Sequence, residues 1–182
     1  MGESRDRETR YALARDRARA LLVLTRQRPP VDVEAVIQAA GVPVVERVLE
    51  EGVRATVGDV AGRRSIILNR DYQIRSAGER RWILAEELGH ILLGHRLVNS
   101  DAPGTSVVGL REWRRVLHER EARAFAAELL MPFGEVSSRW FASLRARPEQ
   151  DSAERARRLA AEFGVTPAAM RIRLEQMRIL RP

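Results

Sequence analysis

Two adjacent carboxylates and a histidine interrupt the apolar run WILAEELGHILLGH at residues 82–95. In a helix, residues four positions apart lie on one face, so Glu86 and His90 can converge on a single cation, with Glu87 close to both. A carboxylate and an imidazole are common ligands of divalent metals, and a neighbouring carboxylate can act as a general base. The spacing therefore indicates two metal ligands and a base on one helix.

A purely structural role is the alternative interpretation, in which Glu86 and Glu87 face solvent on an amphipathic helix. Apolar residues surround them in almost every direction, so at least one carboxylate must face inward: Ile83, Leu84, Leu88, Ile91 and Leu92. A carboxylate that faces a core needs a partner, and a metal would supply one. Without a cation the two carboxylates would repel each other, and one would stay protonated.

A third metal ligand must come from another segment. The chain has no cysteine and three histidines, so any metal must be bound by histidine, aspartate or glutamate. Glu119 precedes Ala122 and Phe125 at helical spacings and is the expected third ligand, with His118 as its alternative. His95 lies five residues beyond His90, and we expect it at the surface or at a helix end.

The elements that must position these residues follow an α+β pattern. Helices are predicted over residues 4–26 and 31–41, and then VPVVERV, VRATVG and RRSIILN predict three short strands in a small twisted sheet. Ser76 and Glu79 form a capping-box pattern that begins a helix ending near Gly94. After a loop at residues 96–109, a helix ends at Pro132, and three shorter helices follow, the last opened by Thr166.

Composition restricts the class of protein only broadly. The net charge of +7 comes entirely from arginine, and 25 acidic residues are interspersed with it, so most of this charge is expected to be solvated surface. The charged first residues and the short ALLVL run predict neither a secretory signal nor a membrane span, and so a cytoplasmic location. We expect an N-terminal helical arm at 1–29, a main domain at 30–135 and a C-terminal segment at 136–182.

Several stretches together resemble the ImmA/IrrE family of bacterial and phage metallopeptidases. ERRWILAEELGHILLGH followed by HEREARAFAAELLMP is similar to the family pattern RFTxAHELGH followed by ExxAxxFAxxLLMP. VDVEAVIQAAGVPV resembles the family's N-terminal helix and strand, RSIILN its edge strand, and LAAEFGVTPAAMRIRLEQM its C-terminal helix-turn-helix. The resemblance implies a small N-terminal sheet packed on HExxH-type helices in a zincin-like fold, followed by a helix-turn-helix-like segment.

The same resemblance implies roles for individual residues. His90 and Glu119 would bind zinc, and Glu87 would be the general base, whereas Glu86 stands where the family has a histidine. A shell of two carboxylates and one imidazole neutralises a divalent ion, weakens it as a Lewis acid and favours manganese or iron over zinc. We therefore expect a metallopeptidase-like protein in which metal binding and proteolysis are weakened or lost.

The implied function is regulatory: limited cleavage of a transcriptional repressor in stress or mobile-element responses. The alternative is an inactive protein that binds its partner or DNA without turnover. The strand RSIILN, with Ile66, Ile67 and Leu68, would bind an extended peptide by β-augmentation.

The C-terminal segment is a candidate DNA-binding element. Residues 136–182 contain ten arginines and five acids, a net charge of +5, and their last helix presents Arg171, Arg173 and Arg178 for phosphate contact. The alternative is that these helices only pack on the main domain.

Overall fold

The computed structural model of the chain describes residues 2–95 and 108–180. Its elements, in order, are α1 (Gly2–Leu24), α2 (Val33–Ala39), β1 (Val44–Arg47), β2 (Ala55–Val60), β3 (Arg63–Asn69), α3 (Ala77–Leu92), α4 (Val108–Leu130), α5 (Phe133–Ala146), α6 (Ser152–Phe163) and α7 (Pro167–Gln176). The predicted α+β class is confirmed, with seven helices and one three-stranded sheet in the described ranges. Most of the loop predicted at 96–109 lies outside the described residues.

The start of α3 follows from its local sequence. The Ser76 hydroxyl accepts a hydrogen bond from the Glu79 amide at 3.1 Å, and the Glu79 carboxylate accepts one from the Arg75 amide at 2.7 Å. The first bond satisfies an amide of the first helical turn, which has no carbonyl partner, and the second ties the residue before the cap to the helix. The predicted helix start is confirmed, and it sets the face on which Glu86 and His90 lie.

The sheet places β3 in the middle rather than at an edge. The strand order is β1-β3-β2, with β1 parallel and β2 antiparallel to β3. Ile66, Ile67 and Leu68 therefore have ladder partners on both sides, and the prediction that this strand is an edge open to a peptide is wrong. The physical reason is that β3 is the most apolar strand and is buried from Ser65 to Asn69, as expected of a central strand.

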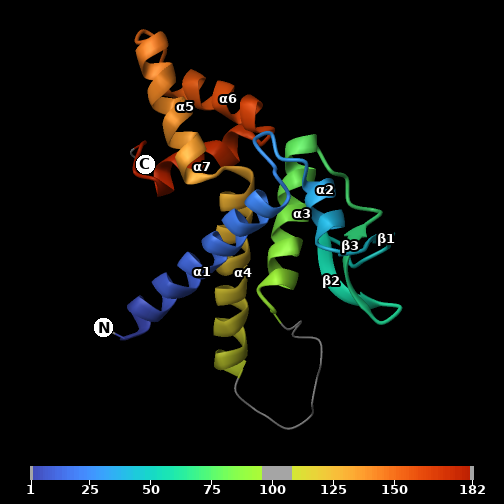
Figure 1. Cartoon of the computed structure of the whole chain (residues 1–182). Helices are drawn as coiled ribbons and strands as arrows, with labels where there is room; N and C mark the ends of the chain where they lie inside the picture. The colour runs from blue at the N-terminus through green and yellow to red at the C-terminus, as the bar shows by residue number, and fades with distance from the viewer. Residues whose placement is uncertain (1, 96–107, 181–182) are drawn as a thin grey trace.

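Helix α4 packs on both α1 and α3, and the three helices lie side by side in Figure 1. Gly89 allows α3 to approach α4 closely, because a Cβ atom there would lie 3.0 Å from Phe125 Cδ1 and 3.2 Å from the Ala122 carbonyl oxygen. The contact brings the Glu86–His90 turn of α3 opposite the Glu119–Arg123 turn of α4. The close helix pair thus builds the candidate site.

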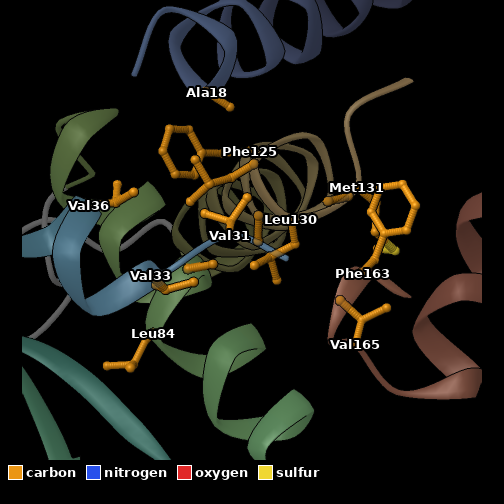
Figure 2. Packing of buried hydrophobic residues seen from close by; sticks show 14 of the residues in the cluster. Ala18, Val31, Val33, Val36, Leu84, Phe125, Leu130, Met131, Phe163 and Val165 are labelled. Atoms are coloured by element: carbon orange, nitrogen blue, oxygen red, sulfur yellow. The ribbon is translucent and has the colours of Figure 1, made fainter. Parts of the chain in front are cut away.

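One hydrophobic core joins the N-terminal, central and C-terminal elements. Figure 2 shows Ala18 of α1, Leu84 of α3, Phe125 of α4 and Phe163 of α6 around the same interior. The helices of residues 136–180 therefore pack on the rest of the chain through buried apolar contacts. None of the helices in the described ranges is long and apolar enough to cross a membrane.

Arg173 is part of this packing. Its side chain is buried, its Nε donates to the Met131 carbonyl at 3.0 Å, and it forms an ion pair with Glu128. The predicted contact between Arg173 and DNA is therefore wrong, because the face of α7 that carries it turns inward. Arg171 and Arg178 remain exposed, and Arg171 pairs with Glu175 at 2.8 Å.

Candidate active site

The expected convergence of α3 and α4 residues is present. His90 Nε2 lies 3.7 Å from Glu119 Oε1, and Glu86 and Glu87 lie one turn earlier on α3. Glu86 is buried, with 4% of its surface exposed, whereas the Glu119 side chain is 42% exposed. At least one motif carboxylate thus faces inward, as the apolar pattern around it predicts.

Two arginines that the sequence did not single out bind the buried Glu86 carboxylate. Arg123 Nε donates to Glu86 Oε1 at 2.9 Å, and an Arg54 Nη atom lies 3.5 Å from Glu86 Oε2. Arg123 also lies 3.6 Å from Glu119 Oε2, so one guanidinium joins the two carboxylates that flank His90. The sequence could have indicated Arg123, because it lies four positions after Glu119 on the same helix face. It could not have indicated Arg54, which reaches Glu86 only because the sheet packs beside α3.

These contacts do not fit a zinc ion bound by Glu86, His90 and Glu119. A zinc site needs three protein atoms with free lone pairs directed at one point about 2 Å away. The Glu86 lone pairs are directed at guanidinium groups, and within residues 2–95 and 108–180 no three His, Asp or Glu side chains are grouped to hold a metal ion. The positive charge between these carboxylates belongs to Arg123 instead.

All three histidines of the chain lie in one cluster at the end of α3. His95 Nδ1 is 3.1 Å from His90 Nδ1, and the His95 ring stacks on His118 with 4.2 Å between the ring centroids. His95 Nε2 is 2.8 Å from Glu121 Oε2. A neutral His95 must donate from Nε2 to that carboxylate, so its Nδ1 accepts from His90 and the His90 Nε2 lone pair faces Glu119.

His95 was expected at the surface or at a helix end, and it follows the end of α3 but is not at the surface. The residue is 5% exposed, because Gly94 adopts a left-handed conformation with φ of 71° and turns the chain back toward α4. Burial lowers the pKa of His95 to about 4, against the hydrogen bond to Glu121, which raises it. Glu121 is the buried acid of α4 at this end of the site. It was not singled out from the sequence, although its position two residues after Glu119 could have indicated it.

Glu87 is protonated in this arrangement at neutral pH. Burial raises the pKa of its carboxyl to about 8, and the charges of Glu86 and Glu119 act in the same direction. This agrees with the expectation that one of the adjacent carboxyls stays protonated. A protonated carboxyl cannot accept a proton from water, so its predicted role as a general base would require a nearby cation.

The raised pKa of Glu87 predicts a pH dependence of stability. The group ionises near pH 4.5 in the unfolded chain and near pH 8 in the folded one, so the folded state binds the extra proton and stability falls as pH rises between these values. His90 and His95, whose pKa values are lowered, act in the opposite direction but only below about pH 6.5. From pH 7 to 8.5 we expect the free energy of unfolding to fall by about 1 kcal/mol, and Glu87→Gln to remove this slope.

Urea unfolding at pH 7 and pH 8.5 checks this prediction. Glu149→Gln is the matched control, because it removes one exposed carboxylate outside the site and leaves Glu87 and the charges around it in place. An equal slope in the Glu87→Gln variant and the unmodified protein would show that Glu87 ionises normally.

Comparison with known proteins agrees with the arrangement of these elements. The model of the peptidase M78 family, described as an IrrE N-terminal-like domain, matches residues 37–175, which include the sheet, the α3–α4 site and most of α7. A search among curated proteins returns no match. The match confirms the resemblance inferred from the motifs and supports a zincin-like, metallopeptidase-type protein. Because it covers well over half of the sequence, the chain belongs to the peptidase M78 family, the IrrE N-terminal-like domain.

Proposed function

We propose that this protein is a regulator that keeps the M78 metallopeptidase fold but binds its protein partner without hydrolysing it. The observation that carries the proposal is the position of Arg123, whose guanidinium bonds to Glu86 and lies near Glu119. It supplies a fixed positive charge between two of the three residues that would have to bind a metal. A guanidinium carries no lone pair for coordination and is not deprotonated in proteins.

Electrostatics favours the arginine over a divalent ion here. A dication about 4 Å from one guanidinium is repelled by about 2 kcal/mol in water and by about 8 kcal/mol at an effective dielectric constant of about 20. Glu86 would also have to leave Arg123 and Arg54 before it could bind the ion. Both effects lower the affinity for zinc, and the manganese or iron expected of a carboxylate-rich shell meets the same repulsion.

The proposed partner is a transcriptional repressor, as the resemblance implies. The strand that offers an edge beside the site is β2, since Arg54 directly precedes it and contacts Glu86. The Arg54 carbonyl accepts from the Asn69 amide, so the alternation of an antiparallel ladder turns the amides of Ala55, Val57 and Asp59 away from β3. An extended partner segment could pair there.

DNA is less well supported as a partner than protein. Of the three arginines expected to contact phosphate, Arg173 is internal and Arg171 has an acidic partner. Arg178 alone would leave a weak electrostatic attachment.

Metal analysis with a proteolysis assay tests the proposed function. We expect substoichiometric zinc after purification, and hydrolysis of fluorescent casein with added zinc, manganese or iron no faster than that of the Glu87→Gln variant. Glu87 is the comparison because it is the general base that hydrolysis would need. Metal-dependent cleavage that Glu87→Gln abolishes would show that the protein is a working peptidase and would overturn the proposal.

A further inference from the structure

A groove with a volume of about 1050 Å³ lies on the Glu86 side of α3. Its walls include residues of five helices: Tyr11 of α1, Trp82 of α3, Ala124 of α4, Phe133 of α5 and Ile172 of α7. Figure 1 shows these helices meeting around the upper half of α4. Glu86 and Arg123 line the groove, whereas Glu87, His90 and Glu119 do not, so the groove adjoins the candidate site and extends away from it.

Arginine dominates the charge of this groove. Seven arginines and three glutamates line it, an excess of four positive charges; the arginines are Arg15, Arg19, Arg54, Arg75, Arg120, Arg123 and Arg173. The glutamates are already engaged: Glu86 by Arg54 and Arg123, Glu128 by Arg19 and Arg173, and Glu79 by the Tyr72 hydroxyl and the Arg75 amide. Arg15, Arg19 and Arg123 also pair with carboxylates outside the lining, which are Glu8, Asp16 and Glu119. The remaining positive charge of the groove therefore lies mainly at Arg75 and Arg120.

Two arginines of the groove have side chains that are exposed to solvent. Arg75 precedes α3 and Arg120 lies on α4, and neither forms an ion pair with a residue in the described part of the chain. A guanidinium binds a carboxylate through two parallel hydrogen bonds, which makes arginine the cation suited to recognising acidic groups. The two side chains come from different elements, the segment before α3 and helix α4, so each can bind a separate acidic group of one ligand.

The size and the apolar lining indicate a peptide rather than a small molecule. Small-molecule pockets usually measure about 300–1,000 Å³ and enclose most of the ligand, whereas this groove is open and at the upper limit of that range. Phe133 and Ile172 line it and are 51% and 54% exposed, so apolar side chains of a ligand would find contacts there. An amphipathic helix that packs in a groove between helices combines these features.

We propose that the groove binds an acidic amphipathic peptide segment of a partner protein, with its carboxylates at Arg75 and Arg120 and its apolar residues at Phe133 and Ile172. This inference deepens the protein-binding role proposed above by naming the chemistry of the partner. It does not depend on whether the protein hydrolyses peptides.

Fluorescence anisotropy with a designed probe tests this proposal. The probe is a labelled helical peptide with glutamates on one face and leucines on the other, and its control replaces every glutamate with glutamine. We expect the full-length protein to bind the glutamate peptide and not the glutamine peptide. Arg75→Gln with Arg120→Gln should weaken binding about tenfold or more, equivalent to about 1.4 kcal/mol, and Ile172→Ser should also weaken it.

Arg157→Gln with Arg158→Gln is the matched control, because it removes two exposed arginines of α6 that lie outside the groove. An equal loss of affinity in this variant would show attraction by net charge alone and overturn the proposal. So would equal binding of the glutamine peptide, no binding of the glutamate peptide at low salt, or groove-dependent binding of ATP in place of the peptide. Cleavage of the probe would contradict the proposed lack of hydrolysis but leave the groove inference intact.

Discussion

The Glu86→His variant is expected to contain well below one zinc ion per chain. The double variant Glu86→His with Arg123→Ala is expected to contain close to one. Histidine introduces the ligand type that the family resemblance implies at this position. It does not remove the guanidinium, which in the unmodified protein bonds Glu86 at 2.9 Å and lies 3.6 Å from Glu119. The variant would contain the imidazole pair and Glu119 with a positive charge still between them.

The second substitution removes that charge. Changes to residues that contact metal ligands commonly alter metal affinity by about 10–100-fold, so we expect Glu86→His with Arg123→Ala to bind zinc at least about tenfold more tightly than Glu86→His alone. Glu86→His with Arg120→Ala is the matched control, because Arg120 is a neighbouring arginine of α4 with no contact to Glu86. Zinc content by elemental analysis and affinity by competition with a chelator measure the effect.

Proteolysis assays of the same variants test whether positions 86 and 123 oppose hydrolysis. If the Glu86→His and Arg123→Ala protein hydrolyses casein, and an added Glu87→Gln change removes the hydrolysis but not the zinc, the residues at positions 86 and 123 are what prevents hydrolysis in the unmodified protein. Full zinc occupancy in the Glu86→His variant alone would show that Arg123 does not oppose the metal. Zinc without hydrolysis would place a further defect outside these residues.

Replacing Glu128 with alanine is expected to lower the free energy of unfolding by about 3–5 kcal/mol. Glu128 is 1% exposed, and one carboxylate oxygen accepts from Arg19 Nε at 2.8 Å and from the Phe133 amide at 3.3 Å. The other oxygen pairs with the buried Arg173. This carboxylate therefore links α4 to α1 and α7, and its removal leaves Arg173 buried without its acidic partner.

The charge of Glu128 adds a pH dependence to this role. Burial raises the pKa of Glu128, but the hydrogen bond from Arg19 and the charge of Arg173 outweigh it, so the pKa lies below the ordinary value of 4.5. A lowered folded pKa means that the stabilisation is present above about pH 4.5 and is lost as pH falls through the folded value. The difference between the unmodified protein and Glu128→Ala should therefore shrink in acid.

Urea unfolding at pH 7 measures the loss, with Glu175→Ala as the matched control. Glu175 also pairs with an arginine, but Arg171 is 70% exposed, so its removal should cost no more than about 1 kcal/mol. Changing Glu128 and Arg173 together to methionine should recover much of the stability, because no buried charge is then left without a partner. A loss below 1 kcal/mol in Glu128→Ala would contradict the structural role of this ion pair.

The sequence by itself determined the features that depend on local spacing. The capping residues Ser76 and Glu79 begin α3, the four-residue spacing places Glu86 and His90 on one face, and the ExxA segment supplies Glu119 opposite His90. The motifs also indicated the family that the comparison confirms. These inferences succeeded because helix geometry relates neighbouring residues in a fixed way, whatever the rest of the chain does.

Only the tertiary structure decided which groups each charged side chain meets. Glu86 contacts Arg54 across 32 positions because β2 packs beside α3, and Arg173 turns inward because Glu128 is buried at the junction of three helices. Strand order placed β3 between its neighbours, and the turn at Gly94 buried His95. Periodicity shows which face of an element is apolar, but not which distant residue packs against it. The free energy of a buried charge depends on that partner, so whether the carboxylate at position 86 binds a metal or an arginine was decided by the packing of the whole chain.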